Sequence, residues 1–174
     1  IVKSLPDTDI RVAEEKSGVK VAADRFDSRL QTLPCEDFPV LPDAAGVPTA
    51  TLAAGAVREM ISKTQFAITG EDTRFFLNGA LFVLRPDAMS LVATDGHRLA
   101  LVTVARESAG HKDGDENKAI LPKKTLGELG RLLADSAEDV VYARGENHLF
   151  FQMGKRMLIS RMIDGQFPAY ERVI

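Results

Sequence analysis

The sequence lacks most of the residues and motifs that build common catalytic and metal sites. Cys35 is the only cysteine among 174 residues, which excludes an intramolecular disulfide and any zinc site built on several cysteines. The sequence contains no Gly-x-Gly-x-x-Gly or Gly-x-x-x-x-Gly-Lys phosphate loop and no Gly-x-Ser-x-Gly nucleophile turn. These absences argue against the common nucleotide-binding folds and against the α/β-hydrolases.

Long hydrophobic runs and a strong net charge are also missing. The apolar stretches are far shorter than the roughly 20 residues of a membrane-spanning helix, and the formal net charge is only −3. This charge gives no sign of nucleic-acid binding, although a basic face can exist within an acidic total. With 45% apolar residues the chain can form a sizeable core, and its single cysteine fits a reducing compartment. We therefore expect a soluble, cytoplasmic protein.

Two segments of the chain match one another. Each contains strands joined by a tight turn and ends in a Phe-Pro pair, and these pairs lie 167 − 38 = 129 residues apart. That period is too long for a solenoid, whose repeats run roughly 20–50 residues, so it indicates a repeated domain. The alternative is two unrelated β-hairpins. The matched turns, at the same offset, are Lys16-Ser17-Gly18 and Gly145-Glu146-Asn147.

The repeat sets the predicted domain boundaries. Residues 1–42 are expected to be the closing part of one domain, and residues 43–174 to form one complete copy. A stretch rich in proline and containing Asp43 and Gly46 separates them as a linker. Because the chain begins at Ile1 in the middle of a pattern, we expect it to be part of a longer protein.

Within the copy, the spacing of apolar residues predicts two amphipathic helices. The first begins near Ala53 and the second at Pro122, a favourable first-turn residue. Strands are predicted at 81–84, 91–93, 99–104 and around 139–143, 148–153 and 156–163, with a loop at 106–118. The order of helix, strands, helix, strands predicts an α+β fold of two similar halves. The expected apolar stripes are Val57, Met60, Ile61 and Thr64, and Leu126, Leu129 and Leu133.

The run Asp95-Gly96-His97-Arg98 is the one segment that resembles a chemical site. An Asp-x-His pair can ligate a metal or act as an acid and a base, but no second His or Cys stands at ligand spacing. The simpler interpretation is a tight turn in which Asp95 accepts backbone hydrogen bonds and Gly96 adopts an unusual φ. A metal-assisted hydrolase, sensitive to chelators, is the enzyme alternative.

Both predicted helices carry basic residues away from the apolar stripe. Exposed Lys and Arg usually form only a solvated surface, but two such helices side by side suit a phosphate backbone without sequence preference. Arg74, Phe75 and Phe76, in a turn before a strand, come closest to a platform for stacking bases. The basic residues are Arg58 and Lys63 on the first helix and Lys123, Lys124 and Arg131 on the second.

Four runs of residues carry a family resemblance. They are Thr64-Gln65-Phe66, Arg74-Phe75-Phe76-Leu77-Asn78-Gly79, Ala93-Thr94-Asp95-Gly96-His97-Arg98-Leu99-Ala100 and Asp164-Gly165-Gln166-Phe167-Pro168-Ala169-Tyr170-Glu171-Arg172-Val173. In this order they resemble the central domain of the bacterial DNA sliding clamp family, the beta subunit of DNA polymerase III. Residues 1–42 resemble the end of the family's first domain, including its Leu-Pro-x-x-Asp-Phe-Pro close.

The resemblance implies a DNA clamp fold, with two helices packed on antiparallel sheets and an internal pseudo-two-fold repeat. It implies a non-catalytic subunit that forms a homodimeric ring around duplex DNA, with helices lining the hole, and that needs no cofactor or metal. The implied partners are double-stranded DNA, the DNA polymerase III alpha subunit, the clamp loader and other proteins with a clamp-binding motif. The family's third domain is absent from this chain.

The resemblance also assigns site residues. The eight basic and aromatic residues named above would face DNA, and Lys123 and Lys124 occupy the best-matched positions. Phe75 and Phe76 replace the family's usual tyrosines and so lack their hydroxyl groups. A pocket for partner peptides would be completed by the third domain, so we expect weaker peptide binding here. Its residues in this chain are Leu77, Thr94, Gly96, His97, Arg98, Leu99, Pro168, Arg172 and Val173. A peptide-binding adaptor with no DNA role is the second alternative.

Overall fold

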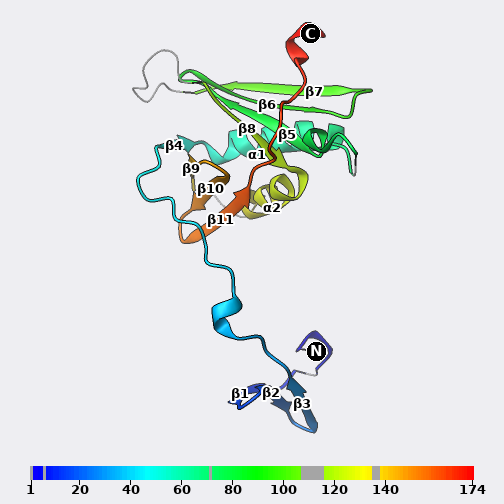
Figure 1. Cartoon of the computed structure of the whole chain (residues 1–174), viewed down its shortest axis with the longest axis vertical. Helices are drawn as coiled ribbons and strands as arrows, with labels where there is room; N and C mark the ends of the chain where they lie inside the picture. Colours follow the sequence, from blue (N-terminus) through cyan, green and yellow to red (C-terminus); the bar gives the residue numbers. More distant parts are fainter. Residues whose placement is uncertain (1, 6, 71, 107–115, 135–137) are drawn as a thin grey trace. The chain divides into compact units, whose positions relative to one another are not determined.

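The computed structural model describes residues 2–5, 7–70, 72–106, 116–134 and 138–174. The chain divides into two compact units, Ile1–Leu41 and Pro42–Ile174. The described part of the first unit holds one three-stranded sheet, and that of the second unit holds two four-stranded sheets and the helices α1 and α2 (Figure 1). No helix in the described ranges is long and apolar enough to span a membrane.

The first unit is an antiparallel meander of β1 (Arg11–Glu15), β2 (Gly18–Ala23) and β3 (Phe26–Leu30). The second unit contains the same meander as β9 (Val140–Arg144), β10 (His148–Met153) and β11 (Arg156–Arg161). The starts of corresponding strands are separated by 140 − 11 = 129, 148 − 18 = 130 and 156 − 26 = 130 residues. The predicted internal match is therefore confirmed, and each copy consists of three strands rather than an isolated hairpin.

The second unit is built from two halves of the same order. The first half runs β4 (Thr49–Leu52), α1 (Ala54–Thr64), β5 (Gly79–Leu84), β6 (Ala88–Thr94) and β7 (Leu99–Ala105). The second half runs β8 (Asn117–Pro122), α2 (Lys123–Ala134), β9, β10 and β11. The sheets have the orders β7-β6-β5-β8 and β11-β10-β9-β4. This confirms the α+β fold with two similar halves, and each sheet takes its fourth strand from the other half.

The exchanged strands β4 and β8 are missing from the sequence prediction. Both lead directly into a helix, so their apolar residues merge with the helical pattern. Pro122 is the last residue of β8 and α2 begins at Lys123, so the prediction of Pro122 as the first helical residue is wrong. Proline is tolerated there because β8 is an edge strand. The first residues of β8 also shorten the predicted loop at 106–118, of which 107–115 lie outside the described residues.

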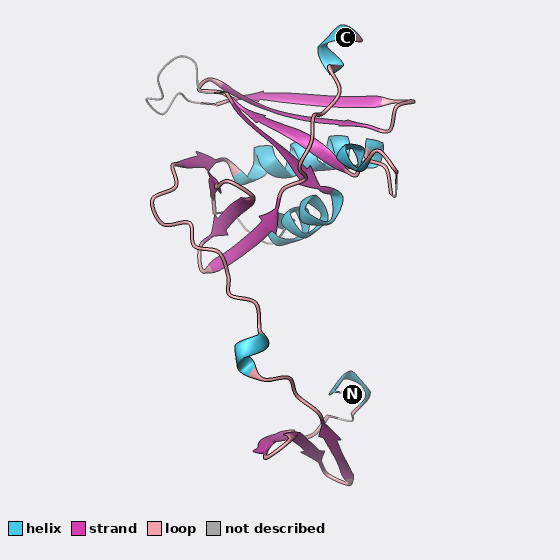
Figure 2. Cartoon of the chain, viewed as in Figure 1, coloured by secondary structure: helices cyan, strands magenta, loops and turns pink. Residues whose placement is uncertain are grey.

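The helices and the inner faces of both sheets share one hydrophobic core. Helices α1 and α2 lie side by side (Figure 2), and a Cβ placed on Gly130 would lie 3.4 Å from Ile61 Cγ2. Phe82 of β5 and Tyr142 of β9 join the two sheets, with ring centroids 5.3 Å apart. The predicted helix stripes are confirmed as buried: Val57, Met60, Ile61, Thr64, Leu126, Leu129 and Leu133.

A second, smaller cluster covers the opposite face of the sheet β7-β6-β5-β8. Side chains alternate along β5, so Phe82 faces the helices while Leu81 and Val83 face outward. The chain after β11 crosses this outer face, where Phe167 and Tyr170 are buried. Phe76 and Leu99 pack against the same cluster, which ties the last residues of the chain to the predicted partner-binding segments.

Candidate functional site

The turn between β6 and β7 is organised by Asp95. Its Oδ1 accepts hydrogen bonds from the backbone N–H groups of His97 (2.9 Å) and Arg98 (3.0 Å). Its Oδ2 accepts a bond from Arg98 Nε at 2.9 Å, and Gly96 has a φ of +88°. The predicted tight turn is thus confirmed, with the carboxylate of Asp95 engaged inside it. Within the described ranges, no three His, Cys, Asp or Glu side chains form a group that could hold a metal ion.

The same hydrogen bonds lower the pKa of Asp95. The backbone N–H groups of His97 and Arg98, helped by the Arg98 side chain, lower the pKa of Asp95 from 3.8 to about 2. A carboxylate whose pKa is lower in the folded chain stabilises the fold above its unfolded pKa. That contribution is lost as pH falls through its folded pKa. Asp95 therefore stabilises the fold at pH 4 and above, and this contribution disappears towards pH 2.

We expect Asp95→Asn to remove this acid dependence. Near neutral pH the variant should have the lower urea midpoint, because asparagine cannot offer an ionised acceptor to the turn. The difference from the wild-type chain should shrink as pH falls from 4 to 2, since protonation then weakens the wild-type turn as well. Urea unfolding at pH 7, 4 and 2.5 measures this. Asp43→Asn is the control, because Asp43 accepts one backbone bond in the linker. A difference that stays constant with pH would contradict the prediction.

Arg98 is held on a second side by Phe66, which follows α1. The guanidinium carbon of Arg98 lies 5.8 Å from the centroid of the Phe66 ring, within cation–π distance. Phe66 is 60% exposed, and this large apolar side chain helps to hold the Arg98 guanidinium in place. Within the guanidinium group Asp95 binds Nε, and among the described residues no hydrogen bond engages the terminal nitrogens, which can therefore meet an incoming carbonyl or carboxylate group.

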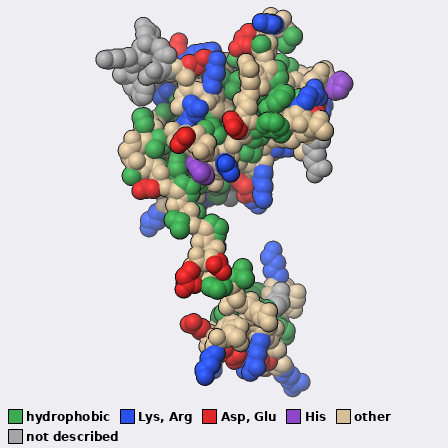
Figure 3. All heavy atoms as spheres, in the orientation of Figure 1, with side chains coloured by type: hydrophobic (Ala, Val, Ile, Leu, Met, Phe, Trp, Pro, Cys, Tyr) green, Lys and Arg blue, Asp and Glu red, His purple; other side chains and the backbone are tan. Residues whose placement is uncertain are grey.

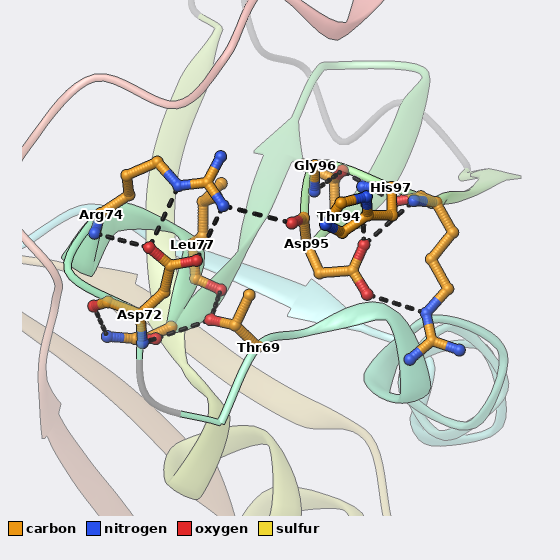
Figure 4. Close-up of polar contacts among 10 residues, drawn as sticks. Thr69, Asp72, Arg74, Leu77, Thr94, Asp95, Gly96 and His97 are labelled. Atoms are coloured by element: carbon orange, nitrogen blue, oxygen red, sulfur yellow. Dashed lines mark hydrogen bonds and ion pairs between the residues drawn. The ribbon is translucent and has the colours of Figure 1, made fainter.

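Arg74 reaches the turn from the loop at 72–78 (Figure 4). Its Nη2 donates to Asp72 Oδ2 at 2.8 Å and to the carbonyl oxygen of Asp95 at 3.4 Å. A Cβ on Gly96 would lie 3.0 Å from Arg74 Nη1, so Arg74 fills the space beside the glycine. The structure therefore places Arg74, a residue predicted to face DNA, directly against the predicted peptide pocket.

The aromatic residues of this loop differ in exposure. Phe76 packs against the outer cluster, whereas Phe75 is 56% exposed. Their rings meet edge to face, with centroids 5.9 Å apart. A Cβ on Gly165 would lie 3.3 Å from the Phe75 ring, so the segment after β11 also touches this loop. Of the two, Phe75 is the side chain that can contact a partner directly.

The nine predicted pocket residues fall into two groups. Thr94 Oγ1 donates to the carbonyl oxygen of Arg98 at 2.7 Å, inside the turn, and Leu77 is buried in the 72–78 loop, whose Arg74 reaches that turn. With Gly96, His97, Arg98 and Leu99 they form the first group, on or beside the turn. Pro168, Arg172 and Val173 form the second, exposed on the C-terminal segment. That segment lines a cavity of about 540 Å³, but of the nine predicted pocket residues only Pro168 is among the cavity's lining residues.

The other basic residues predicted to face DNA lie on the helices, and their contacts differ. Lys63 pairs with Glu59 along α1 and Arg131 with Glu128 along α2. Lys123 Nζ donates to the carbonyl oxygen of Ile68 at 3.2 Å. Arg58 and Lys124 are exposed and have no ion-pair partner in the described part of the chain. Figure 3 shows basic and acidic side chains interspersed on the face in view.

Sequence reasoning missed three residues that shape this site. Phe66 holds Arg98, Asp72 holds Arg74, and Asn78 bonds to the backbone of Asp72. The Asp-x-Arg spacing of residues 72–74 is a local signal that could have found one of them. Asn78 bonds to Thr69 and Asp72 within the same local stretch, whereas the contact of Phe66 with Arg98 joins residues 98 − 66 = 32 apart, which no local pattern reports.

Comparison with known proteins gives a consistent family. Residues 51–169 match the model of the DNA polymerase III beta subunit, central domain. The whole chain aligns at 39% identity with the "Beta sliding clamp" of Pseudomonas putida, covering 47% of that protein. The chain therefore spans about half the length of the curated relatives it matches.

Solved structures agree with this match. The crystal structure of the DNA polymerase III subunit beta from Pseudomonas aeruginosa has a TM-score of 0.82 and 36% identity, with 99% of this chain and 47% of that chain covered. A sliding clamp from Bartonella birtlesii bound to griselimycin has a TM-score of 0.84 and 36% identity, again covering 99% and 47%. The family match, the doubled helix-and-sheet fold and the clamp-like motifs lead to one conclusion: this chain belongs to the family of the DNA polymerase III beta subunit, the bacterial sliding clamp.

Proposed function

We propose that the protein is a sliding clamp, a non-catalytic processivity factor that encircles duplex DNA as a homodimeric ring in the bacterial cytoplasm. The observation that carries this proposal is the helix layer, in which α1 and α2 lie side by side with their apolar stripes in the core. Their remaining faces carry the basic residues, among them Arg58 and Lys124. Such a surface binds phosphates without reading bases.

The start of α2 supports this assignment. Lys123 and Lys124 are its first two residues, and its first turn has no acidic residue. A cation at a helix N-terminus is electrostatically unfavourable, since the helix dipole already makes that end positive. The same arrangement suits a phosphate, which the lysines and the positive end of the helix dipole attract together.

Weak attraction to DNA fits a sliding ring. A closed ring cannot leave DNA sideways, so it needs no tight contact, and strong phosphate binding would resist sliding. Intrahelical pairing of Lys63 with Glu59 and of Arg131 with Glu128 reduces the local positive charge. The net charge of −3 is consistent with such a modest electrostatic surface.

The DNA role is tested by reversing the charge of Lys123 and Lys124 to Glu in the full-length protein. We expect loading on primed circular DNA and processive synthesis to fall sharply. The slope of log affinity against log salt should drop by about two, one for each lost phosphate contact. Lys155→Glu, in the turn between β10 and β11, is the control. Unchanged loading and processivity in the double variant would favour the adaptor that binds peptides alone.

The proposed partner site is the surface around the β6–β7 turn. Relatives from Pseudomonas aeruginosa and Bartonella birtlesii have been solved bound to griselimycin, and we propose that this chain binds it through the nine pocket residues. Leu99, Pro168 and Val173 offer apolar contact, while His97 and Arg98 offer polar contact at the rim. The polymerase alpha subunit, the clamp loader and other clamp-binding proteins would insert a short segment there.

We also propose that residues 1–42 are the end of a first domain of the same type and that 43–174 is a central domain. The matching meanders β1–β3 and β9–β11 support this. So does the contrast between Phe167, which is 9% exposed on its sheet, and its counterpart Phe38, which is 75% exposed. A preceding four-stranded sheet of the first domain would cover Phe38 as β5–β8 cover Phe167.

A further inference from the structure

The loop at 72–78 is closed by the side chain of Asn78. Asn78 Oδ1 accepts bonds from Thr69 Oγ1 at 2.6 Å and from the backbone N–H of Asp72 at 2.9 Å. Asn78 Nδ2 donates to the carbonyl oxygen of Asp72 at 3.1 Å. Because both backbone polar groups of Asp72 are bonded to a single side chain, Asp72 has little freedom to rotate.

Asp72 in turn fixes Arg74. Its Oδ1 accepts bonds from the backbone N–H of Arg74 at 2.8 Å and from Arg74 Nε at 3.1 Å. Its Oδ2 accepts a bond from Arg74 Nη2 at 2.8 Å. A fork of this kind sets the plane of a guanidinium group as well as its position. The side chain of Asp72 is 20% exposed, so water competes only partly for it.

Arg74 then meets the turn from one side, at the carbonyl oxygen of Asp95 and beside Gly96. The base of the loop is also anchored, because the backbone N–H of Lys123 donates to the carbonyl oxygen of Asn78 at 3.0 Å. The chain of contacts therefore runs from the start of α2 through Asn78 and Asp72 to Arg74, and ends at the turn. Figure 4 shows its last part, from Asp72 through Arg74 to Asp95.

We propose that Asp72 and Asn78 are positioning residues for the partner-binding turn and act on it through Arg74. Neither belongs to the pocket surface assigned above, and this inference rests on the proposed partner site. Their role is to hold the guanidinium of Arg74 against Gly96, so that His97 and Arg98 are presented in one conformation. A preorganised surface loses less entropy on binding and so binds more tightly.

The proposal is tested by a double-mutant cycle on the 174-residue chain. The variants are Asp72→Asn, Arg74→Gln and the two combined, and the binding constant for griselimycin is measured by NMR titration. Asp72→Asn is expected to weaken binding by about three- to ten-fold, as the loss of a charge-assisted bond would. In the Arg74→Gln background the same change should have no further effect, because Asp72 acts only through Arg74.

Two further variants keep the test decisive. Arg74→Lys keeps the charge but cannot form the fork, so it should weaken binding as much as Arg74→Gln does. Asp87→Asn, in the turn at the other end of β6, should leave binding unchanged. Multiplicative effects of Asp72→Asn and Arg74→Gln in the double variant would overturn the proposal. The proposal would also be overturned if Asp72→Asn bound griselimycin as tightly as the wild-type chain does.

Amide hydrogen exchange separates this inference from the partner site itself. The N–H groups of Gly96 and His97 are bonded within the turn, so Asp72→Asn should speed their exchange and Asp87→Asn should not. If the wild-type chain fails to bind griselimycin, the proposed partner site loses its support while the exchange rates still test the positioning role. Unchanged exchange in Asp72→Asn would refute that role.

Discussion

Gly79→Ala is expected to destabilise the second unit by about 1–3 kcal/mol, as overpacking of a close-packed site does. Gly79 is the first residue of β5 and lies opposite Pro122 of β8. A Cβ at Gly79 would overlap the carbonyl oxygen of Leu121 and would lie 2.9 Å from Ile163 Cδ1. The first neighbour is backbone of the paired strand, so relief requires β8 to move. Urea unfolding at neutral pH measures the change.

The matched control is Gly55→Ala in α1. A Cβ at Gly55 would meet nothing within 4 Å, and alanine is favoured over glycine in a helix by about 1 kcal/mol. Gly55→Ala should therefore stabilise the chain slightly, while the same substitution at Gly79 destabilises it strongly. Equal effects of the two substitutions would show that the close approach of β8 and the chain at Ile163 does not constrain Gly79.

Gly96→Ala is expected to weaken griselimycin binding by about ten-fold or more, which corresponds to about 1.4 kcal/mol or more. Gly96 has a φ of +88°, which an alanine adopts only at an energetic cost. Its Cβ would also stand 3.0 Å from Arg74 Nη1. Backbone strain and displacement of Arg74 both act on the turn that carries His97 and Arg98. The unit should remain folded, because this turn lies outside the core.

Gly46→Ala is the control that separates the backbone strain of an alanine at positive φ from the contact of its Cβ with Arg74. Gly46 also has a positive φ, of +77°, but a Cβ there would meet nothing within 4 Å. We expect Gly46→Ala to lower stability modestly and to leave griselimycin binding unchanged. The comparison uses NMR titration of both variants together with their urea midpoints. Binding that survives Gly96→Ala would place the partner site elsewhere, for example at the cavity beside Phe167 and Tyr170.

Much of the fold could be read from local pattern. The apolar stripes of both helices are buried as the spacing requires, and the internal match of the meanders is visible in the residues themselves. The strands β4 and β8 escaped prediction because each is joined to its helix without a turn and is stabilised by pairing with a strand of the other half. Such pairing joins residues distant in sequence, and no local pattern encodes it.

In the candidate site, too, some features follow from local sequence and others from tertiary contacts. By itself the sequence determined the turn at Asp95 and Gly96, because an aspartate that bonds the next backbone N–H groups and a glycine with positive φ act within four residues. It also determined the family, through motifs that occur in one order. Only the tertiary structure decided that Arg74 supports this turn, that Phe66 lies beneath Arg98, and that Asn78 links the loop to α2. Those contacts require chain segments about 20–50 residues apart to be brought together by strand pairing and core packing, and a linear sequence does not display that proximity.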